Sequence, residues 1–193
     1  MGVRLGVLTP TYGRPTLRDA LATTEGADVR VVAWDTDAEP PSWLDCVVVR
    51  TPGPRGSAPR ADGGAWARGH ALREVGDTAD VWAFADDDDV WLPGTVELRR
   101  AWADARPDAL HVGRYIGDDG VTVGGWTERV IQRGIGHPVM VAPGPELVAL
   151  ARSDAWPVCY EADLMIARAL VAMGVPVEWH EEPVLRVRPW GRV

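Results

Sequence analysis

The chain has 193 residues, 46% of them hydrophobic and 25% charged, which is ordinary for one globular α/β domain spanning 1–193. The formal net charge of −8 argues against nucleic acid as the main partner, because phosphate-backbone binding needs a basic surface, and only a local basic groove would allow it. All 20 basic residues are arginines, which excludes chemistries that depend on a lysine.

No apolar run reaches membrane-spanning length, and the start of the chain, Met1 to Leu8, lacks the apolar core and cleavage site of a signal peptide. We therefore expect a cytoplasmic protein without a membrane span. Cys46 and Cys159 are too few and too scattered for a zinc site or a disulfide framework, so we expect two buried free thiols.

The first elements alternate between strand and helix. An apolar run over Val3–Leu8 predicts a buried strand that ends at the loop Thr9–Pro15, and helical spacing follows over Leu17–Thr24. Apolar runs over Val29–Trp34 and Cys46–Val49 predict the next two strands. Strands that alternate with helices indicate a largely parallel sheet.

The alternation continues after a loop. Thr51–Gly64 is rich in Pro, Gly and Arg and predicts that loop. Helical spacing over Ala65–Val75 leads into an apolar strand, Val81–Ala85, and a helix over Leu98–Ala105 and a strand over Leu110–Tyr115 follow.

The last third of the chain contains the weakest pattern and the clearest helix. Ile116–Pro145 has many glycines and no clear periodicity, so we expect loops that line a site or become ordered on binding. Ala162–Met173 has one apolar face, with Glu161 and Asp163 in the first turn. Two apolar runs predict the closing strands: Val175–Trp179 and Val184–Val187.

Four consecutive aspartates, Asp86–Asp89, follow the strand Val81–Ala85. Adjacent carboxylates repel one another, so a buried strand that ends in them needs a positive partner there. Mg²⁺ and Mn²⁺ prefer oxygen ligands, and Mg²⁺ is typically held by one or two carboxylates plus substrate phosphates. Because open α/β sheets bind ligands at the carboxyl ends of their strands, we favour a metal site over a solvated acidic loop.

Four segments resemble, in order and spacing, the family 2-like glycosyltransferases of the GT-A fold. They are Thr9-Pro10-Thr11-Tyr12-Gly13-Arg14-Pro15, Asp35, Ala85–Asp89 and Glu161-Ala162-Asp163-Leu164. The resemblance covers essentially the whole chain and implies a three-layer α/β/α fold with a mostly parallel central sheet. It also implies an enzyme that moves a sugar from a UDP- or GDP-linked donor to a hydroxyl acceptor, with Mn²⁺ or Mg²⁺ as cofactor.

The resemblance implies roles for individual residues. Those implied to bind the nucleotide sugar are Thr9, Thr11, Tyr12, Arg14, Asp35, Arg68, Asp86 and Asp87. The implied metal ligands are Asp88 and Asp86, but because all four positions are aspartate, the register of Asp87 and Asp89 is the alternative. The implied catalytic base is Glu161, with Asp163 as the alternative.

These roles agree with the chemistry of glycosyl transfer. Negative charge develops on the leaving diphosphate, where a carboxylate-held cation and arginine stabilise it. A carboxylate beside the acceptor hydroxyl takes its proton as attack proceeds. The N-terminus of a helix stabilises the carboxylate of Glu161, although the same position also suits a residue that only complements the helix dipole.

The sequence departs from the family pattern at three places. Gly13 and Gly69 stand where asparagine is usual, and Arg186-Val187-Arg188-Pro189-Trp190 stands where many members carry a metal-binding histidine. Arg188 is a candidate to neutralise the diphosphate directly. His180 is the other candidate metal ligand, against the alternative that it packs beside Trp179.

Tryptophans are numerous, and we expect Trp34, Trp82 and Trp102 in the core. Three others lie in loops or near the chain end, where they either pack or stack on a sugar or base: Trp126, Trp156 and Trp190.

Two other hypotheses compete with the assignment as a glycosyltransferase. A sugar-nucleotide nucleotidyltransferase shares the general fold but uses a Gly-rich, Arg-containing N-terminal loop and a catalytic lysine, and this chain has neither. A non-catalytic module that binds a nucleotide sugar or a divalent cation is the alternative from a different class. Turnover that disappears in Asp88→Ala and Glu161→Ala separates an enzyme from such a module.

Overall fold

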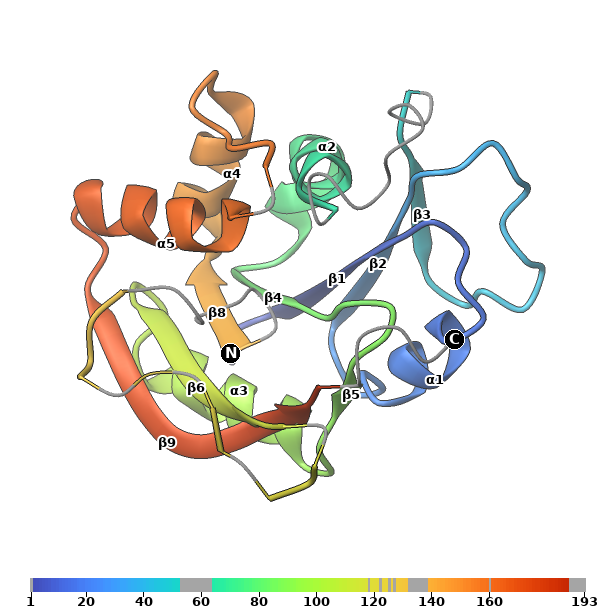
Figure 1. The fold of residues 1–193 in the computed structure, drawn as a ribbon. Helices are drawn as coiled ribbons and strands as arrows, with labels where there is room; N and C mark the ends of the chain where they lie inside the picture. The colour runs from blue at the N-terminus through green and yellow to red at the C-terminus, as the bar shows by residue number, and fades with distance from the viewer. Residues whose placement is uncertain are drawn as a thin grey trace.

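The computed structural model describes residues 2–52, 64–117, 119–121, 123–124, 126, 128–131, 139–159 and 161–187 (Figure 1). The elements in chain order are β1 (Leu5–Thr11), α1 (Leu17–Ala22), β2 (Val29–Trp34), β3 (Val47–Arg50), α2 (Ala65–Val75), the 3₁₀ turn η1 (Gly76–Thr78), β4 (Val81–Phe84), β5 (Val90–Trp91), α3 (Thr95–Ala105), β6 (Leu110–Ile116), β7 (Val123–Gly124), β8 (Met140–Pro143), α4 (Gly144–Arg152), α5 (Ala162–Ala172) and β9 (Val177–Arg186).

Nine strands form one mixed sheet in the order β3-β2-β1-β4-β8-β6-β9-β5, with β7 paired to β6. The strands β1 to β4 are parallel to one another, and β8 is antiparallel to both of its neighbours. On the far side, β6 and β9 are parallel and β5 is antiparallel to β9. The sheet is therefore parallel in its first half and mixed in its second.

Helices cover both faces of this sheet. Figure 1 shows α2, α4 and α5 on one face and α1 and α3 on the other. The sheet interior is apolar, and Trp34, Trp82 and Trp102 are buried as expected. The predicted three-layer α/β/α fold is confirmed.

Strand β1 continues through Pro10 to Thr11, beyond the end that the sequence predicted. Proline is rare in a central strand because it lacks an N–H. Here β4 ends opposite Leu8, whose carbonyl accepts a hydrogen bond from the Ala85 N–H at 3.1 Å. Since alternate residues of a strand face alternate neighbours, the Pro10 nitrogen points to the side where β4 has already ended. The strand can therefore extend as far as the acidic residues.

The largest error of the sequence prediction concerns β8 and α4. The central strand β8 falls inside Ile116–Pro145, which was predicted as loops, and α4 was not predicted at all. Gly144-Pro145 has the composition of a turn, but proline suits the first turn of a helix, where its missing N–H is not needed. The helical spacing of the buried Leu147, Val148, Leu150 and Ala151 was the available signal.

The two predicted closing strands are one continuous strand, β9, which bends around the end of the sheet (Figure 1). Its pairing with β6 shifts register between Val112 and Arg114 and again between Arg114 and Tyr115. A bulge of this kind bends a strand and re-aims its side chains. It lets the exposed Glu181 and Glu182 lie between two apolar runs of one strand.

Two further observations concern the cysteines and the helices. Cys46 and Cys159 are free thiols as predicted, although each is only partly buried. Within the described residues, none of the helices combines the length and the hydrophobicity that crossing a bilayer requires.

Candidate functional site

The carboxyl ends of β1, β2 and β4 meet at one edge of the sheet. The Asp35 N–H, directly after β2, donates to the Thr11 carbonyl at the end of β1 at 2.9 Å. Residues Asp86–Asp89, which we call the acidic turn, follow β4 and lead into β5, and the Asp89 N–H donates to the Asp86 carbonyl at 3.2 Å. Parallel pairing thus brings together three segments that are far apart in the sequence.

Burial alternates along the acidic turn. The side chains of Asp86 and Asp88 are 33% and 43% exposed. Asp87 and Asp89 are only 4% and 8% exposed. Because a ligand can reach only exposed carboxylates, burial favours the register in which Asp86 and Asp88 face the ligand.

Asp87 is held by Thr11, the last residue of β1, and by Arg14 in the loop that follows. The Thr11 hydroxyl donates to Asp87 Oδ2 at 2.6 Å, and Arg14 Nη1 donates to Asp87 Oδ1 at 2.9 Å. Burial raises the pKa of Asp87 to about 6, against the hydrogen bond from Thr11 and the charge of Arg14, while Asp88 and Asp86 raise it further. Desolvation therefore outweighs the ion pair at this carboxylate.

Arg14 bridges two carboxylates of the acidic turn. The same Nη1 that contacts Asp87 lies 2.5 Å from Asp88 Oδ2. Burial lowers the pKa of Arg14, but the charges of Asp87, Asp88 and Asp86 outweigh that effect and the pKa is raised. The guanidinium is therefore a permanent cation between these two acids.

Arg68 neutralises the other exposed carboxylate. It projects from α2, is 1% exposed, and its Nη2 forms an ion pair with Asp86 Oδ1. Its guanidinium also lies over the Phe84 ring, 5.7 Å from the centroid. Each exposed acid of the turn thus meets one arginine, from α2 or from the loop after β1.

The other predicted nucleotide-binding residues flank this group. Thr9 is buried, and its hydroxyl has no hydrogen-bond partner within the described part of the chain. Tyr12 is partly buried. Asp35 is buried and accepts a hydrogen bond from the Thr51 hydroxyl at 2.5 Å. Thr51 was missed, although it follows β3 at the same edge, and that position was the signal.

The predicted catalytic acids lie at the N-terminal end of α5. Glu161 is the N-cap residue and is exposed, and Asp163 is partly buried in the first turn. Figure 1 shows α5 on the same face of the sheet as α2, with its N-terminal end toward α2. Whether either acid is the base stays a prediction.

The acidic turn fits a metal site that a ligand completes. No three His, Cys, Asp or Glu side chains within the described ranges are grouped so that they could hold a metal ion by themselves. Carboxylate oxygens are nevertheless the donors that Mg²⁺ and Mn²⁺ prefer, and one or two carboxylates with substrate phosphates suffice for Mg²⁺. Asp88 and Asp86 are the exposed pair that would hold it.

His180 packs in a histidine cluster formed by Trp102, His111 and His180. Its ring stacks on Trp102 with centroids 3.9 Å apart and planes at 9°, and its Nε2 lies 3.0 Å from His111 Nδ1. This supports packing rather than metal binding for His180. Arg188, the candidate to neutralise the diphosphate, lies outside the described residues.

The tryptophans singled out as stacking candidates are mostly core residues. Trp126 and Trp156 are buried, and the Trp156 indole N–H donates to the Ala65 carbonyl at 2.9 Å. Trp190 lies outside the described residues. A Cβ at Gly69 would lie 2.4 Å from Trp156 Nε1, so the indole fills the space that asparagine would need at this position.

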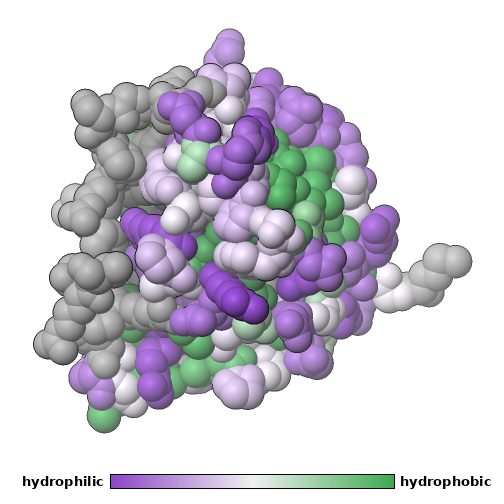
Figure 2. Space-filling model, turned by 90° about the vertical axis from the view of Figure 1, so that its right-hand side faces the viewer, coloured by the Kyte–Doolittle hydropathy of each residue, from purple (hydrophilic) through white to green (hydrophobic). Residues whose placement is uncertain are grey.

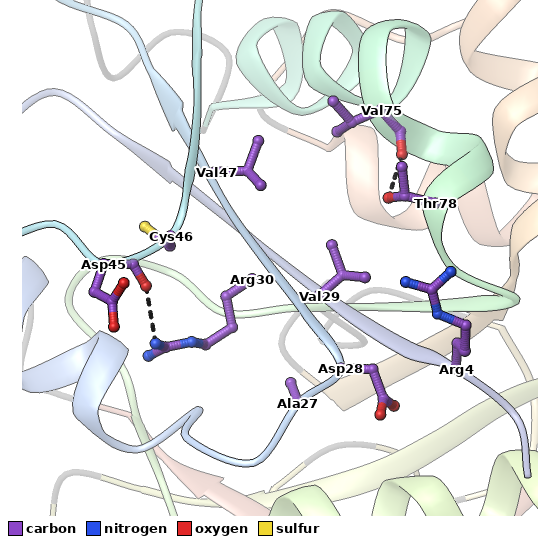
Figure 3. A pocket seen from close by; sticks show the side chains of 10 residues that line it. All are labelled: Arg4, Ala27, Asp28, Val29, Arg30, Asp45, Cys46, Val47, Val75 and Thr78. Atoms are coloured by element: carbon purple, nitrogen blue, oxygen red, sulfur yellow. Dashed lines mark hydrogen bonds between the residues drawn. The ribbon is translucent and has the colours of Figure 1, made fainter.

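A cavity of about 550 Å³ lies at the opposite edge of the sheet, where β1, β2 and β3 begin. Figure 3 shows its lining, in which Arg30 Nη2 donates to the Asp45 carbonyl at 3.0 Å. None of its lining residues belongs to the acidic turn. On the side of the molecule that carries β3, Figure 2 shows a hydrophobic patch among mostly hydrophilic side chains, with smaller hydrophobic areas along its lower part.

No protein-family model and no curated protein sequence matches this chain. Among solved structures it is similar to residues 1–349 of S. aureus TarS, a glycosyltransferase, at 16% identity and a TM-score of 0.68. The match covers 96% of this chain and 60% of that one, so the chain spans about 60% of the TarS fragment.

Two further structures are similar. The TarS fragment in complex with UDP-GlcNAc matches at 15% identity and a TM-score of 0.69, over 96% of this chain and 58% of that chain. A197 from STIV matches at 15% identity and a TM-score of 0.50, over 96% and 82% of the respective chains. At such low identity these similarities show a glycosyltransferase-like fold.

Proposed function

We propose that this protein is a glycosyltransferase that moves a sugar from a nucleoside diphosphate sugar to a hydroxyl acceptor. The observation that carries the proposal is the acidic turn at the carboxyl edge of a glycosyltransferase-like sheet, with two exposed carboxylates each facing an arginine. The binding of UDP-GlcNAc by TarS, a protein of similar fold, supports a UDP-linked donor, and a GDP-linked donor is the alternative.

The donor diphosphate is the natural ligand for this arrangement. A divalent cation, Mn²⁺ or Mg²⁺, would supply Lewis acidity toward the leaving diphosphate when it is bound. Asp88, with Asp86, would hold it. Arg68 fixes the orientation of Asp86, and the buried Asp87 fixes the acidic turn through Thr11. Preorganised charges of this kind lower the barrier because they need no rearrangement during the reaction.

The acceptor side would use a carboxylate at the start of α5. Glu161 is exposed at the helix N-terminus, where a carboxylate interacts favourably with the helix dipole. A carboxylate that is ionised at neutral pH can accept the proton of an attacking hydroxyl. Direct attack with such a base inverts the anomeric centre, so we propose an inverting reaction with Glu161 as base and Asp163 as the alternative.

Donor hydrolysis and transfer test this function. We expect purified protein with Mn²⁺ to release nucleoside diphosphate from UDP- or GDP-sugars, and Asp88→Asn and Glu161→Gln to lower the rate by about 100-fold or more. Glu146→Gln is a matched control, because Glu146 also lies in the first turn of a helix, α4. Asp45→Asn is a second control, because Asp45 lies at the opposite edge.

A thermal-shift measurement beside the turnover assay separates an enzyme from a binding module. A thermal shift with UDP and Mn²⁺ but without turnover of any donor in a broad panel would identify a non-catalytic binder. Neither a thermal shift nor turnover across UDP- and GDP-sugars would contradict the proposed function altogether.

A further inference from the structure

The two exposed carboxylates of the acidic turn meet arginines of different character. Arg68 is fixed: it lies on α2, its side chain is 2% exposed, and it packs over Phe84. Arg14 lies in the loop after β1, directly after Gly13, which has a φ of 82° that favours glycine, and its side chain is 35% exposed. Of the two, Arg14 is the more exposed cation and the one that a ligand can reach.

Arg14 also contacts Asp88, one of the two exposed carboxylates that would hold a metal ion. One guanidinium nitrogen lies 2.9 Å from Asp87 Oδ1 and 2.5 Å from Asp88 Oδ2. A cation shared between these two oxygens neutralises carboxylates that would otherwise repel each other across a largely desolvated site. A divalent ion that binds Asp88 must compete with this contact.

We propose that Arg14 is a built-in counter-cation that a divalent metal ion displaces from Asp88, so that Arg14 sets the metal affinity of the empty site. The displaced guanidinium needs another anion, and the donor diphosphate supplies one. Metal and donor then bind cooperatively, with Arg14 as the positioning residue that couples them. The role of the donor rests on the proposed function, whereas the competition between Arg14 and the metal does not.

Titration of the ligand-free protein with Mn²⁺ tests the competition. The signal of free aqueous Mn²⁺ in electron paramagnetic resonance reports binding without any donor, acceptor or turnover. We expect Arg14→Gln to bind Mn²⁺ about tenfold more tightly than the wild type, because the guanidinium no longer competes with the ion for Asp88. Arg14→Lys keeps the charge and should give a smaller increase.

A matched control separates local competition from net charge. Arg18→Gln removes the same charge one helical turn further along the chain, where the guanidinium lies over the Trp43 ring at 5.7 Å. We expect its Mn²⁺ affinity to equal that of the wild type within about twofold, because exposed charges at longer range are screened. Adding Asp88→Asn to Arg14→Gln should abolish the gain, and circular dichroism verifies that each variant is folded.

The outcomes are decisive in both directions. Tighter Mn²⁺ binding by Arg14→Gln alone supports the proposal. Unchanged, weaker or undetectable binding by this variant overturns it, as does an equal gain in Arg18→Gln. UDP should then raise the Mn²⁺ affinity of the wild type more than that of Arg14→Gln, and an equal rise would overturn the coupling. A failed donor-turnover assay alongside a positive Mn²⁺ result would overturn only the proposed function.

Discussion

Two groups of ionisable side chains lie in different halves of the sheet, and their partners differ in kind. In the acidic turn, carboxylates face arginines and a hydroxyl at an edge that solvent reaches, as for Asp88 and Arg14. In the histidine cluster, His180 stacks on Trp102, and His111 Nε2 lies 2.8 Å from the Arg106 carbonyl. The charged groups of the acidic turn are accessible, so they are suited to binding a charged ligand. The stacked rings of the histidine cluster contact one another, so they are suited to packing.

Two buried arginines show the same contrast. Arg68 points to the acidic turn and pairs with Asp86. Arg99, on α3, lies 4.0 Å over the Trp91 ring and donates to the Met140 carbonyl at 3.2 Å, and burial lowers its pKa to about 9. Burial alone therefore does not identify an arginine that belongs to the candidate site. The side chains that the arginine contacts identify it.

The largest expected effect comes from replacing the buried Arg68 with methionine, and the same change at the buried Arg99 is its matched control. Arg68→Met removes the ion pair between Arg68 and Asp86, so we expect donor turnover to fall by about 100-fold. Arg99→Met changes a buried side chain that contacts Trp91 and Met140 rather than Asp86, so turnover of the folded variant should stay within about threefold. Steady-state kinetics on folded variants measures both, and equal losses would erase the distinction between the two sites.

Gly69→Asn tests whether the Trp156 indole fills the space that an asparagine side chain would need at this position. The added Cβ meets the Trp156 indole at 2.4 Å, so we expect overpacking to lower the free energy of unfolding by about 2 to 3 kcal/mol. Urea denaturation measures this loss. In the background of Trp156→Ala, which opens the space, the same substitution should cost much less, and a strictly additive double variant would contradict the packing explanation.

The sequence predicted which strand ends meet beside the acidic turn, because the alternation of parallel strands and helices determines this arrangement. The strand Val29–Trp34 and the helix Ala65–Val75 were predicted to the residue, and these elements position Asp35 and Arg68. The order of strands and helices along the chain then places these two residues at the same edge of the sheet as the acidic turn.

Other features of the structure carried too little local signal. Four identical aspartates give no pattern that shows which of them face outward; Thr11 and Arg14 decide it by holding Asp87 inside. The helix α4 was missed because Gly144-Pro145 has the composition of a turn. The histidine cluster forms across β6, β9 and α3, and no spacing in the sequence reveals such a contact.

Asp87→Asn should stabilise the metal-free protein. Because burial raises the pKa of Asp87 to about 6, the favourable contribution of the protonated form is complete below the ordinary value of 3.8 and is lost as the pH rises through 6. Measured in EDTA at about pH 8, the variant should gain about 2 kcal/mol of unfolding free energy, and the gain should shrink toward about pH 4. A gain that does not depend on pH would mean that the ionisation of Asp87 is not its cause.

The smallest effect is expected in the histidine cluster, and it has the opposite sign. Burial, followed by the charge of His111, lowers the pKa of His180 to about 4, against the charges of Glu182 and Glu178. The neutral ring is therefore the form that packs. Its stabilising contribution is complete above the ordinary pKa of 6.5 and is lost as the pH falls toward 4.

His180→Phe keeps a flat ring against Trp102 but cannot be protonated. Since His180 is partly exposed, solvent screening reduces the effect, and we expect the variant to avoid a loss of about 1 kcal/mol between about pH 7 and pH 5. The urea midpoints of both proteins at several pH values measure this difference. The comparison removes the contribution of carboxylates that titrate equally in both proteins. Parallel curves would show that His180 protonation does not limit the acid stability of this end of the sheet. If the wild type instead gained stability relative to the variant as the pH fell, protonated His180 would be bound by Glu178 or Glu182 and the cluster would be a charged site like the acidic turn.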